Sequence, residues 1–231
     1  RLSEHQQEER RQRRMEQKTK GAIFDLDGVV VDTAKYHYLA WDRLAGEMGF
    51  RLDSSVNERL KGVSRMDSLE IVLQAGGIGG ISQEEKLRLA QRKNGYYQEM
   101  IKEISPSELL PGTVEFIKKL KERNYKTALG SASKSGGLIL KRLGIISLFD
   151  VVVDGNQVSR AKPDPEVFFT AADRMGIPYE DCVVIEDAGA GVRAAHAGGM
   201  KCIGVGDRDV LAEADLVVEN TAELSQIELI F

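Results

Sequence analysis

A short apolar segment that runs straight into two carboxylates is the feature that most constrains this chain. Residues 21–33 read GAIFDLDGVVVDT. Because strand side chains alternate with a period of two, Asp25 and Asp27 can project toward the same place from the strand's C-terminal end. Ligands of open parallel sheets bind beyond that end. Two close carboxylates there can hold Mg²⁺ or divide nucleophilic and acid–base roles, so the segment predicts an active site.

An EF-hand calcium loop also begins with closely spaced acids. In that loop glycine occupies the sixth position, and a helix leads into it. Here Gly28 is the fourth residue counted from Asp25, and the residues before Asp25 are β-branched and aromatic. Both departures favour the end of a strand.

Length and composition leave room for one core and an inserted segment. The 231 residues are 42% hydrophobic, and a formal net charge of −4 does not favour nucleic acid or an anionic membrane as partner. We therefore expect a small-molecule partner. We also expect a monomer, which the charge itself does not determine. No run approaches the ~20 apolar residues of a membrane span, and no secretory signal is visible. Cys182 and Cys202 lie in apolar runs, which predicts reduced, buried thiols in a cytoplasmic protein.

The first twenty residues differ in composition from the rest. Leu2 and Met15 are the clearly apolar residues there, and a basic cluster contains Arg10, Arg11, Arg13 and Arg14. Such a cluster can be an arm that binds nucleic acid, or a solvated extension that precedes a start at Met15. We interpret residues 1–20 as an extension.

Helical periodicity dominates the block that follows the first strand. Residues 33–105 contain no convincing strand, residues 34–48 form an amphipathic helix pattern, and the capping serines Ser64 and Ser82 open further helices. This block predicts a helical cap domain that is inserted into a core, with hinges near Thr33 and Pro106.

Strands and helices alternate in the remainder of the chain. Strand patterns occupy residues 126–129, 150–153, 182–185, 202–205 and 215–218, and helix patterns occupy residues 113–123, 135–143, 165–175 and 189–197. The alternation predicts an α/β fold with a doubly wound parallel sheet, a Rossmann-like core built from residues 21–32 and 106–231.

Polar groups follow several of the predicted strands. Residues 131–134, Ser131-Ala132-Ser133-Lys134, offer hydroxyls and a turn of backbone N–H groups, which can cradle a phosphate. Lys162 follows the next strand, and the acids Glu186 and Asp187 follow the one after that. With the first acid pair, this set suits Mg²⁺-assisted phosphoryl transfer, because the cations neutralise charge while an aspartate attacks phosphorus.

Each of these features also has a purely structural interpretation. A serine after a strand is commonly a helix N-cap, a lone Lys162 would be solvated, and Glu186 with Asp187 could serve a helix dipole. The segment GAGVRA at residues 189–194 matches a dinucleotide fingerprint. It comes too late, because roughly 40 residues after it cannot complete a nucleotide-binding half.

Four ordered motifs identify a family resemblance. DLDGVVVDT, the serine of LGSASK, the lysine of AKPDP and the acids of VVIEDAGAG are similar to those of the haloacid dehalogenase superfamily, phosphotransferase branch. The cap segments YHYLAWDRLA, LKGVSRMDSLE and QRKNGYY resemble those of β-phosphoglucomutases. That resemblance implies an Mg²⁺-dependent isomerase that interconverts β-glucose 1-phosphate and glucose 6-phosphate through bound β-glucose 1,6-bisphosphate.

The resemblance also implies roles for the core residues. Asp25 would be the nucleophile that becomes an aspartyl phosphate, and Asp27 the general acid and base for the sugar oxygen. Mg²⁺ would be held by Asp25, the backbone carbonyl of Asp27 and Asp187, with Glu186 in or next to this shell.

Phosphate and sugar contacts follow from the same resemblance. Ser131, the N–H of Ala132 and Lys162 would grip the transferring phosphate, Arg65 would hold the second phosphate, and His37 would link cap closure to Asp27. The other implied substrate-binding residues are Thr33, Trp41, Lys61, Gly62, Val63, Ser64, Ser68, Lys93, Ser133 and Lys134.

Two alternatives remain open from the sequence. The core motifs are shared with capped sugar-phosphate phosphatases of the same fold, and the mutase interpretation depends on the cap residues. The second alternative is a regulatory member of the family that binds a sugar phosphate without catalysis. The presence together of Asp25, Asp27, Lys162 and Asp187 argues against it.

Overall fold

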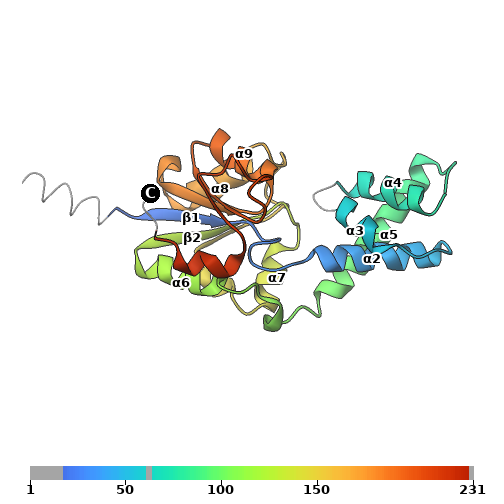
Figure 1. Cartoon of the computed structure of the whole chain (residues 1–231), viewed down its shortest axis with the longest axis horizontal. Coiled ribbons are helices and arrows are strands. Elements are labelled where there is room, and N and C mark those ends of the chain that lie inside the picture. The colour runs from blue at the N-terminus through green and yellow to red at the C-terminus, as the bar shows by residue number, and fades with distance from the viewer. Residues whose placement is uncertain (1–17, 61–63, 229–231) are drawn as a thin grey trace, which may run out of the picture. The chain divides into compact units, whose positions relative to one another are not determined.

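The computed structural model describes residues 18–60 and 64–228 (Figure 1). These residues form two compact units. The smaller unit is Asp32–Glu108, and the larger unit comprises the described residues before and after that segment. Each unit has its own hydrophobic core.

A six-stranded parallel sheet lies at the centre of the larger unit. Its strands are β1 (Lys20–Phe24), β2 (Tyr125–Gly130), β3 (Val151–Val153), β4 (Cys182–Glu186), β5 (Lys201–Val205) and β6 (Leu216–Val218). They lie in the order β3-β2-β1-β4-β5-β6, and every neighbouring pair is parallel. The strand order reverses between β1 and β4, which makes the sheet doubly wound. The predicted fold class is confirmed.

Helices cover both faces of this sheet. They are α6 (Thr113–Glu122), α7 (Gly136–Arg142), α8 (Glu166–Met175), α9 (Gly189–Ala197) and the short 3₁₀ turns η2 (Ile146–Leu148), η3 (Tyr179–Asp181) and η4 (Thr221–Gln226). Figure 1 shows α8 and α9 on one side of β1 and β2 and α6 on the other.

The central strand β1 is buried on both faces because helices pack on each. Ile23 packs with Phe168 of α8 in the core of one face. Phe24 points the other way and meets Phe116 and Phe149 edge-on, with ring centroids 6.0 and 6.1 Å away. Burial of each such side chain contributes roughly 1.5–3 kcal/mol, which explains why β1 is a continuous apolar run that ends abruptly in acids.

Two aspartates stand just before β3 and β6, although the sequence pattern places them inside those strands. The carboxylate of Asp150 accepts the backbone N–H of Thr127 at 2.8 Å, and that of Asp215 accepts the N–H of Cys202 at 2.8 Å. Each carboxylate thus supplies an acceptor where a backbone carbonyl would otherwise continue the ladder, so the strands start one residue later.

The smaller unit is helical, as the sequence predicts for this block. It contains α2 (Ala34–Glu47), α3 (Ser54–Leu60), α4 (Arg65–Ala75), α5 (Gln83–Ile101) and the 3₁₀ turn η1 (Pro106–Glu108). The side chains of Ser64 and Ser82 cap α4 and α5 by accepting N–H groups three residues later, both at 3.2 Å. The unit extends to Glu108, whose carboxylate binds Lys35, Tyr36 and the N–H of Ser105.

The chain leaves and re-enters the larger unit at neighbouring positions. Val31 forms an antiparallel bridge with Leu109. The N–H of Leu110 donates to the carbonyl of Val30 at 2.9 Å, and the hydroxyl of Thr113 donates to the carbonyl of Val29 at 2.6 Å. The insertion therefore does not interrupt the hydrogen bonding around the end of β1.

Within the described residues, no helix combines the length and apolar character needed to cross a bilayer. Cys182 and Cys202 are both buried and free.

Candidate active site

The residues that follow β1 and β4 lie where the strand order of the sheet reverses. Asp25 comes directly after β1, and Glu186 is the last residue of β4. Because β1 and β4 are parallel neighbours, their carboxyl ends open at the same edge. Crevices at such a reversal point are the usual ligand sites of doubly wound sheets.

A buried lysine joins two of these acids. The ammonium of Lys162 donates to Asp25 Oδ1 at 3.0 Å, to Glu186 Oε2 at 2.8 Å and to the carbonyl of Gly130 at 3.3 Å. Burial lowers the pKa of Lys162, but the charges of Asp25 and Glu186 outweigh burial and raise that pKa above its ordinary value. Lys162 is therefore a permanent cation beside Asp25. The alternative interpretation, in which Lys162 is a solvated surface lysine, is wrong.

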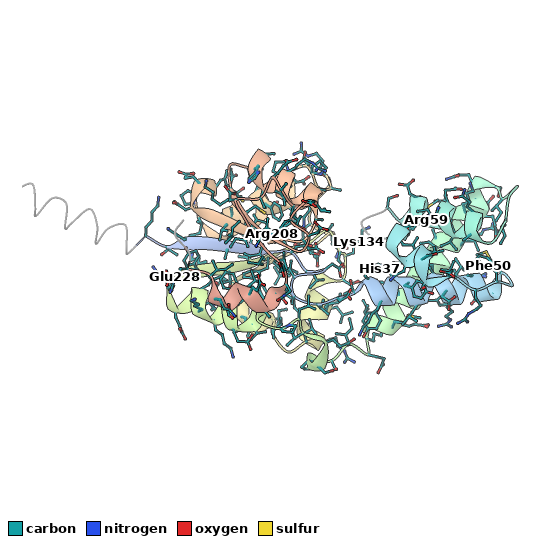
Figure 2. The ribbon with its side chains drawn as sticks, in the orientation of Figure 1. His37, Phe50, Arg59, Lys134, Arg208 and Glu228 are labelled. Atoms are coloured by element: carbon teal, nitrogen blue, oxygen red, sulfur yellow. The ribbon has the colours of Figure 1, made fainter. Side chains whose placement is uncertain are left out.

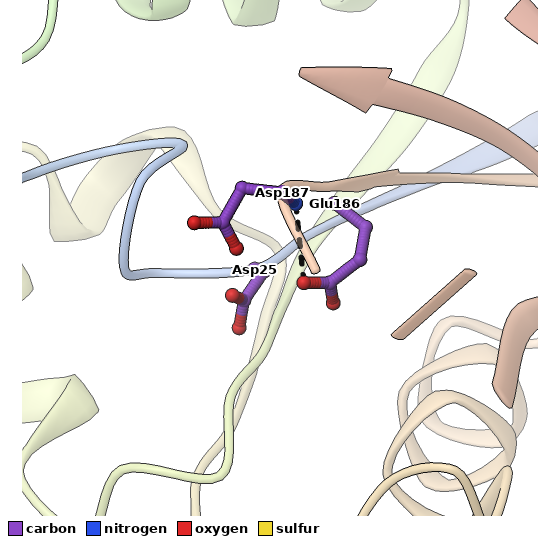
Figure 3. A group of neighbouring side chains, drawn as sticks. All are labelled: Asp25, Glu186 and Asp187. Atoms are coloured by element: carbon purple, nitrogen blue, oxygen red, sulfur yellow. Dashed lines mark hydrogen bonds between the residues drawn. The ribbon is translucent and has the colours of Figure 1, made fainter. Parts of the chain in front are cut away.

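Three acids lie together at this edge (Figure 3). Asp25, Glu186 and Asp187 each offer a carboxylate oxygen, and these oxygens lie within 4.8 Å of one another. Burial and the charge of Asp25 raise the pKa of Glu186 to about 8, against the opposing charge of Lys162. Burial and Asp25 likewise raise the pKa of Asp187 to about 7. The single ammonium of Lys162 does not balance three carboxylates.

This donor set fits a hard divalent cation. Carboxylate oxygens are the ligands that Mg²⁺ prefers, and a cation would relieve the repulsion that holds the two pKa values up. Asp25, Glu186 and Asp187 are three of the four residues that the sequence assigns to the metal. The fourth, Asp27, is outside this side-chain group; its expected contribution is a backbone carbonyl, and its side chain is half-buried.

Two glycines make room for these acids. A Cβ on Gly28 would lie 2.0 Å from Asp187 Oδ2, and Gly28 has a φ of +72°. A Cβ on Gly191 would lie 2.0 Å from the carboxyl group of Glu186. Gly191 belongs to the segment that matches a dinucleotide fingerprint, so its contact with Glu186 gives this glycine a role in the acidic site.

The loop after β2 is shaped by its own serines. The N–H of Ser133 donates to Ser131 Oγ at 3.1 Å, and the N–H of Ser135 donates to Ser133 Oγ at 3.2 Å. Ser131 is buried, whereas Ala132 and Lys134 are exposed; Lys134 is labelled in Figure 2. These turns fold residues 131–134 into a tight loop, as a phosphate cradle requires.

The smaller unit holds a second group of sequence-predicted residues. Lys93 is 3% exposed, and its ammonium lies 2.8 Å from Nδ1 of His37 and 4.7 Å from the ring centroid of Trp41. Burial and the charge of Arg65 lower the pKa of Lys93 to about 7. Burial lowers the pKa of His37 to about 3, and the charges of Lys93 and Arg65 add to this effect. The charged form of the buried Lys93 amine is thus disfavoured.

The other predicted residues of this unit lie around the start of α4, except Thr33, which directly precedes α2. Arg65 is exposed, and its Nη2 donates to Asn94 Oδ1 at 3.1 Å. Ser68 and Thr33 are buried. Lys61, Gly62 and Val63 lie outside the described residues.

A family model described as haloacid dehalogenase-like hydrolase matches residues 19–199. The chain belongs to this family. Haloacid dehalogenase-like enzymes use Mg²⁺, and the acidic group at the end of β1 and β4 is the matching feature here.

Several relatives of known activity or structure are similar over most of the chain. The β-phosphoglucomutase of Bacillus subtilis (strain 168) is 44% identical over 207 residues, which cover 89% of this chain and 92% of that protein. A crystal structure of β-phosphoglucomutase from Clostridium difficile has a TM-score of 0.77 and 42% identity, and covers 90% of this chain and 93% of that one. The phosphorylated carbohydrates phosphatase of Thermotoga maritima is 32% identical, over 78% of this chain and 82% of that protein. The resemblance to β-phosphoglucomutases read from the sequence is confirmed.

Some residues that contact the predicted site residues carry little signal in the sequence of this haloacid dehalogenase-like chain. Asn94 accepts a hydrogen bond from Arg65, and only its position next to Lys93 marks it in the sequence. Gly28 and Gly191 stand inside recognisable motifs, but the acid that each accommodates is known only from the fold.

Lys93→Met should stabilise the smaller unit. The pKa of Lys93 is about 7 in the folded protein, against an ordinary value of 10.5 for lysine. Between these two values the unfolded chain holds more protons, so wild-type stability rises with pH across this range. Because each pKa unit corresponds to about 1.4 kcal/mol, the variant should gain on the order of 2–4 kcal/mol at pH 6. The gain should shrink toward pH 9.

Urea unfolding at pH 6 and pH 9 measures this difference. Lys86→Met is the matched control, because Lys86 lies on the same helix and forms an ion pair with Glu70 at 2.6 Å. A stability gain of equal size at both pH values would contradict the buried charge as its cause.

Proposed function

We propose that this protein is an Mg²⁺-dependent β-phosphoglucomutase that interconverts β-D-glucose 1-phosphate and glucose 6-phosphate. The observation that carries this proposal is that each unit holds a cationic side chain among its predicted site residues, Lys162 beside Asp25 in one and the exposed guanidinium of Arg65 in the other. A bisphosphate intermediate needs two anion sites, whereas a single phosphate ester needs one. β-Glucose 1,6-bisphosphate, formed and used on the enzyme, is that intermediate.

The chemistry follows from groups at the end of β1. The carboxylate of Asp25 attacks phosphorus of the bisphosphate, and the bond from phosphorus to the sugar oxygen breaks as the aspartyl phosphate forms. Asp27 gives its proton to the departing sugar oxygen and later takes one from the attacking hydroxyl. Lys162, Ser131 and the N–H of Ala132 hold the phosphate oxygens in place. When bound by the acids, Mg²⁺ supplies further charge neutralisation.

The smaller unit supplies sugar recognition. Arg65 binds the second phosphate, since its planar guanidinium can bind two oxygens at once. In the larger unit, Ser133 and Lys134 of the loop after β2 also bind substrate. The residues that contact the sugar are Thr33, His37, Trp41, Lys61, Gly62, Val63, Ser64, Ser68 and Lys93. As a cap, residues 33–105 exclude water, so that the aspartyl phosphate is transferred to the sugar and is not hydrolysed.

A capped sugar-phosphate phosphatase is the second candidate. Relatives with that activity include the Thermotoga maritima phosphatase and, at 31% identity, the fructose-1-phosphate phosphatase YqaB of Escherichia coli. In such an enzyme water, and not a sugar hydroxyl, would take the phosphoryl group from Asp25. The greater similarity to β-phosphoglucomutase favours the mutase.

The cellular setting is part of this proposal. The substrate is a small sugar phosphate, and buried free thiols at Cys182 and Cys202 suit the reducing cytoplasm. We further propose that the enzyme acts as a monomer, with neither nucleic acid nor membrane as a partner.

Product identity tests the function directly. Given β-glucose 1-phosphate, Mg²⁺ and a trace of glucose 1,6-bisphosphate, the protein should make glucose 6-phosphate far faster than inorganic phosphate. Both products are measured in the same reaction by ³¹P NMR. Inorganic phosphate as the main product would replace the mutase with the phosphatase.

Arg65→Ala is the informative variant in this assay. It should lose much of the mutase rate, because a charged hydrogen bond to phosphate contributes about 1.5–3 kcal/mol. It should still form phosphoenzyme from a small phosphoryl donor, since the core is unchanged. Arg59→Ala, on neighbouring α3, is the control, because Arg59 binds Gln74 within the same unit.

A further inference from the structure

An aromatic side chain with no role so far stacks on His37. Tyr97 of α5 is buried, and its ring lies parallel to that of His37, with an interplanar angle of 9° and centroids 4.1 Å apart. His37 comes from α2, so the contact joins the two helices. Figure 2 marks His37 near the start of α2.

The same tyrosine ring also faces Lys93. The ammonium lies 5.4 Å from the centroid of Tyr97 and 4.7 Å from that of Trp41, on different helices. Rings within about 6 Å of a cation attract it through their quadrupoles, more strongly where water is excluded. Tyr97 and Trp41 therefore hold Lys93 against His37, in a unit where burial disfavours its charge.

The contact between Lys93 and His37 determines the hydrogen placement on the imidazole. The two nitrogens, Lys93 Nζ and His37 Nδ1, are 2.8 Å apart. An ammonium has three donors and no acceptor, so Nδ1 must accept. A neutral imidazole that accepts at Nδ1 carries its hydrogen on Nε2. Below pH about 7, where Lys93 is charged, the Nε2–H tautomer is the one that fits.

The charged groups around His37 keep it neutral. Lys93 faces it from α5 and Arg65 acts on it from α4, and both disfavour a second positive charge on the imidazole. Lys35 of α2, its near neighbour in sequence, binds Glu108 instead.

We propose that Tyr97 is a positioning residue whose ring fixes His37 as the neutral Nε2–H tautomer on Lys93, so that Nε2 serves as a hydrogen-bond donor to an oxygen of the sugar phosphate. This inference rests on the proposed function for the identity of the acceptor. The tautomer and its dependence on Tyr97 do not depend on which substrate the enzyme uses.

Nitrogen-15 NMR of the imidazole groups tests the inference without substrate. At pH 6 wild-type His37, assigned by comparison with His37→Gln, should show a protonated Nε2 and an unprotonated Nδ1. Tyr97→Phe keeps the ring and should retain this pattern. Tyr97→Leu removes the ring, and His37 should then exchange between tautomers and begin to protonate at higher pH than in the wild type.

Tyr96→Leu is the matched control. Tyr96 is the preceding residue of α5, and its ring contacts Arg43 at 3.9 Å to the centroid, away from His37. Its loss should leave the His37 signals unchanged. A wild-type His37 with its hydrogen on Nδ1, or already protonated at pH 6, would overturn the inference whatever the variants do. Unchanged His37 signals in Tyr97→Leu would overturn it too.

Kinetics supply the second measurement. In Tyr97→Leu, kcat/KM for β-glucose 1-phosphate should fall about 10-fold or more, Tyr97→Phe should restore it, and phosphoenzyme formation from acetyl phosphate should be unchanged. If Tyr97→Leu changes the tautomer but leaves kcat/KM as in the wild type, Nε2 does not serve the sugar phosphate and the inference fails. If the wild type releases inorganic phosphate while the NMR pattern holds, the proposed function alone has failed.

Discussion

Asp25→Asn should lower turnover by at least about 10⁴-fold, equivalent to roughly 5 kcal/mol of barrier. An amide cannot form the bond to phosphorus on which the proposed reaction depends. The substitution also removes a partner of Lys162, so Lys162 would keep Glu186 as its ion pair. Stopped-flow and steady-state assays of glucose 6-phosphate formation measure the loss.

The label on the enzyme gives an independent measurement. After an acid quench of a reaction with ³²P-labelled bisphosphate, the label should be on the peptide that contains Asp25. Asp173→Asn, an exposed acid of α8, serves as the control and should keep full activity. Label on any other residue would falsify Asp25 as the nucleophile.

Removal of divalent metal should abolish activity, and Mg²⁺ should restore it. Two buried carboxylates and a half-buried one, with one ammonium, need a cation to be ionised together. Asp187→Asn should weaken Mg²⁺ binding, measured by isothermal titration calorimetry. Full activity after exhaustive treatment with EDTA would contradict a role for metal.

The pH dependence of this site has a definite sign. In the metal-free protein the pKa of Glu186 is about 8 and that of Asp187 about 7, against ordinary values of 4.5 for glutamate and 3.8 for aspartate. Between about pH 4 and 8 the folded state thus holds protons that the unfolded chain has released, so stability falls as pH rises. Mg²⁺ competes with these protons, and its affinity should rise from pH 6 to pH 8. Thermal unfolding with and without Mg²⁺ should therefore diverge as pH increases.

The sequence predicts both the fold of the larger unit and the site at its sheet edge. Strands such as β1 and β4 are buried on both faces, so they are apolar throughout, and their ends are marked by the first acid. The parallel order then brings Asp25, Lys162 and Glu186 to one edge. The order of the motifs along the chain is enough to predict this site, because the parallel sheet brings the ends of the strands close together.

The sequence predicts the site of the smaller unit less well, because its site residues lie on helices whose buried faces depend on packing. Lys93 reads as part of a solvated helix face, yet the packing of α2 against α5 buries it between Trp41 and Tyr97. Helix α3 has seven residues and no strong periodic pattern, so the sequence does not predict its start. Its local sequence lacks the length over which a helical period becomes visible.

The neighbouring positions at which the chain leaves and re-enters the larger unit have an evolutionary consequence. Val31 and Leu109 are bridged to each other. The segment between them therefore connects to the larger unit as a loop whose two ends are fixed side by side. Any folded module with adjacent termini could be grafted there without shifting a strand. The inserted unit, which recognises the sugar, can therefore change or be exchanged in evolution while the residues of phosphoryl transfer in the larger unit stay the same. A chimera that carries the inserted unit of a phosphatase relative would inherit that relative's choice of acceptor.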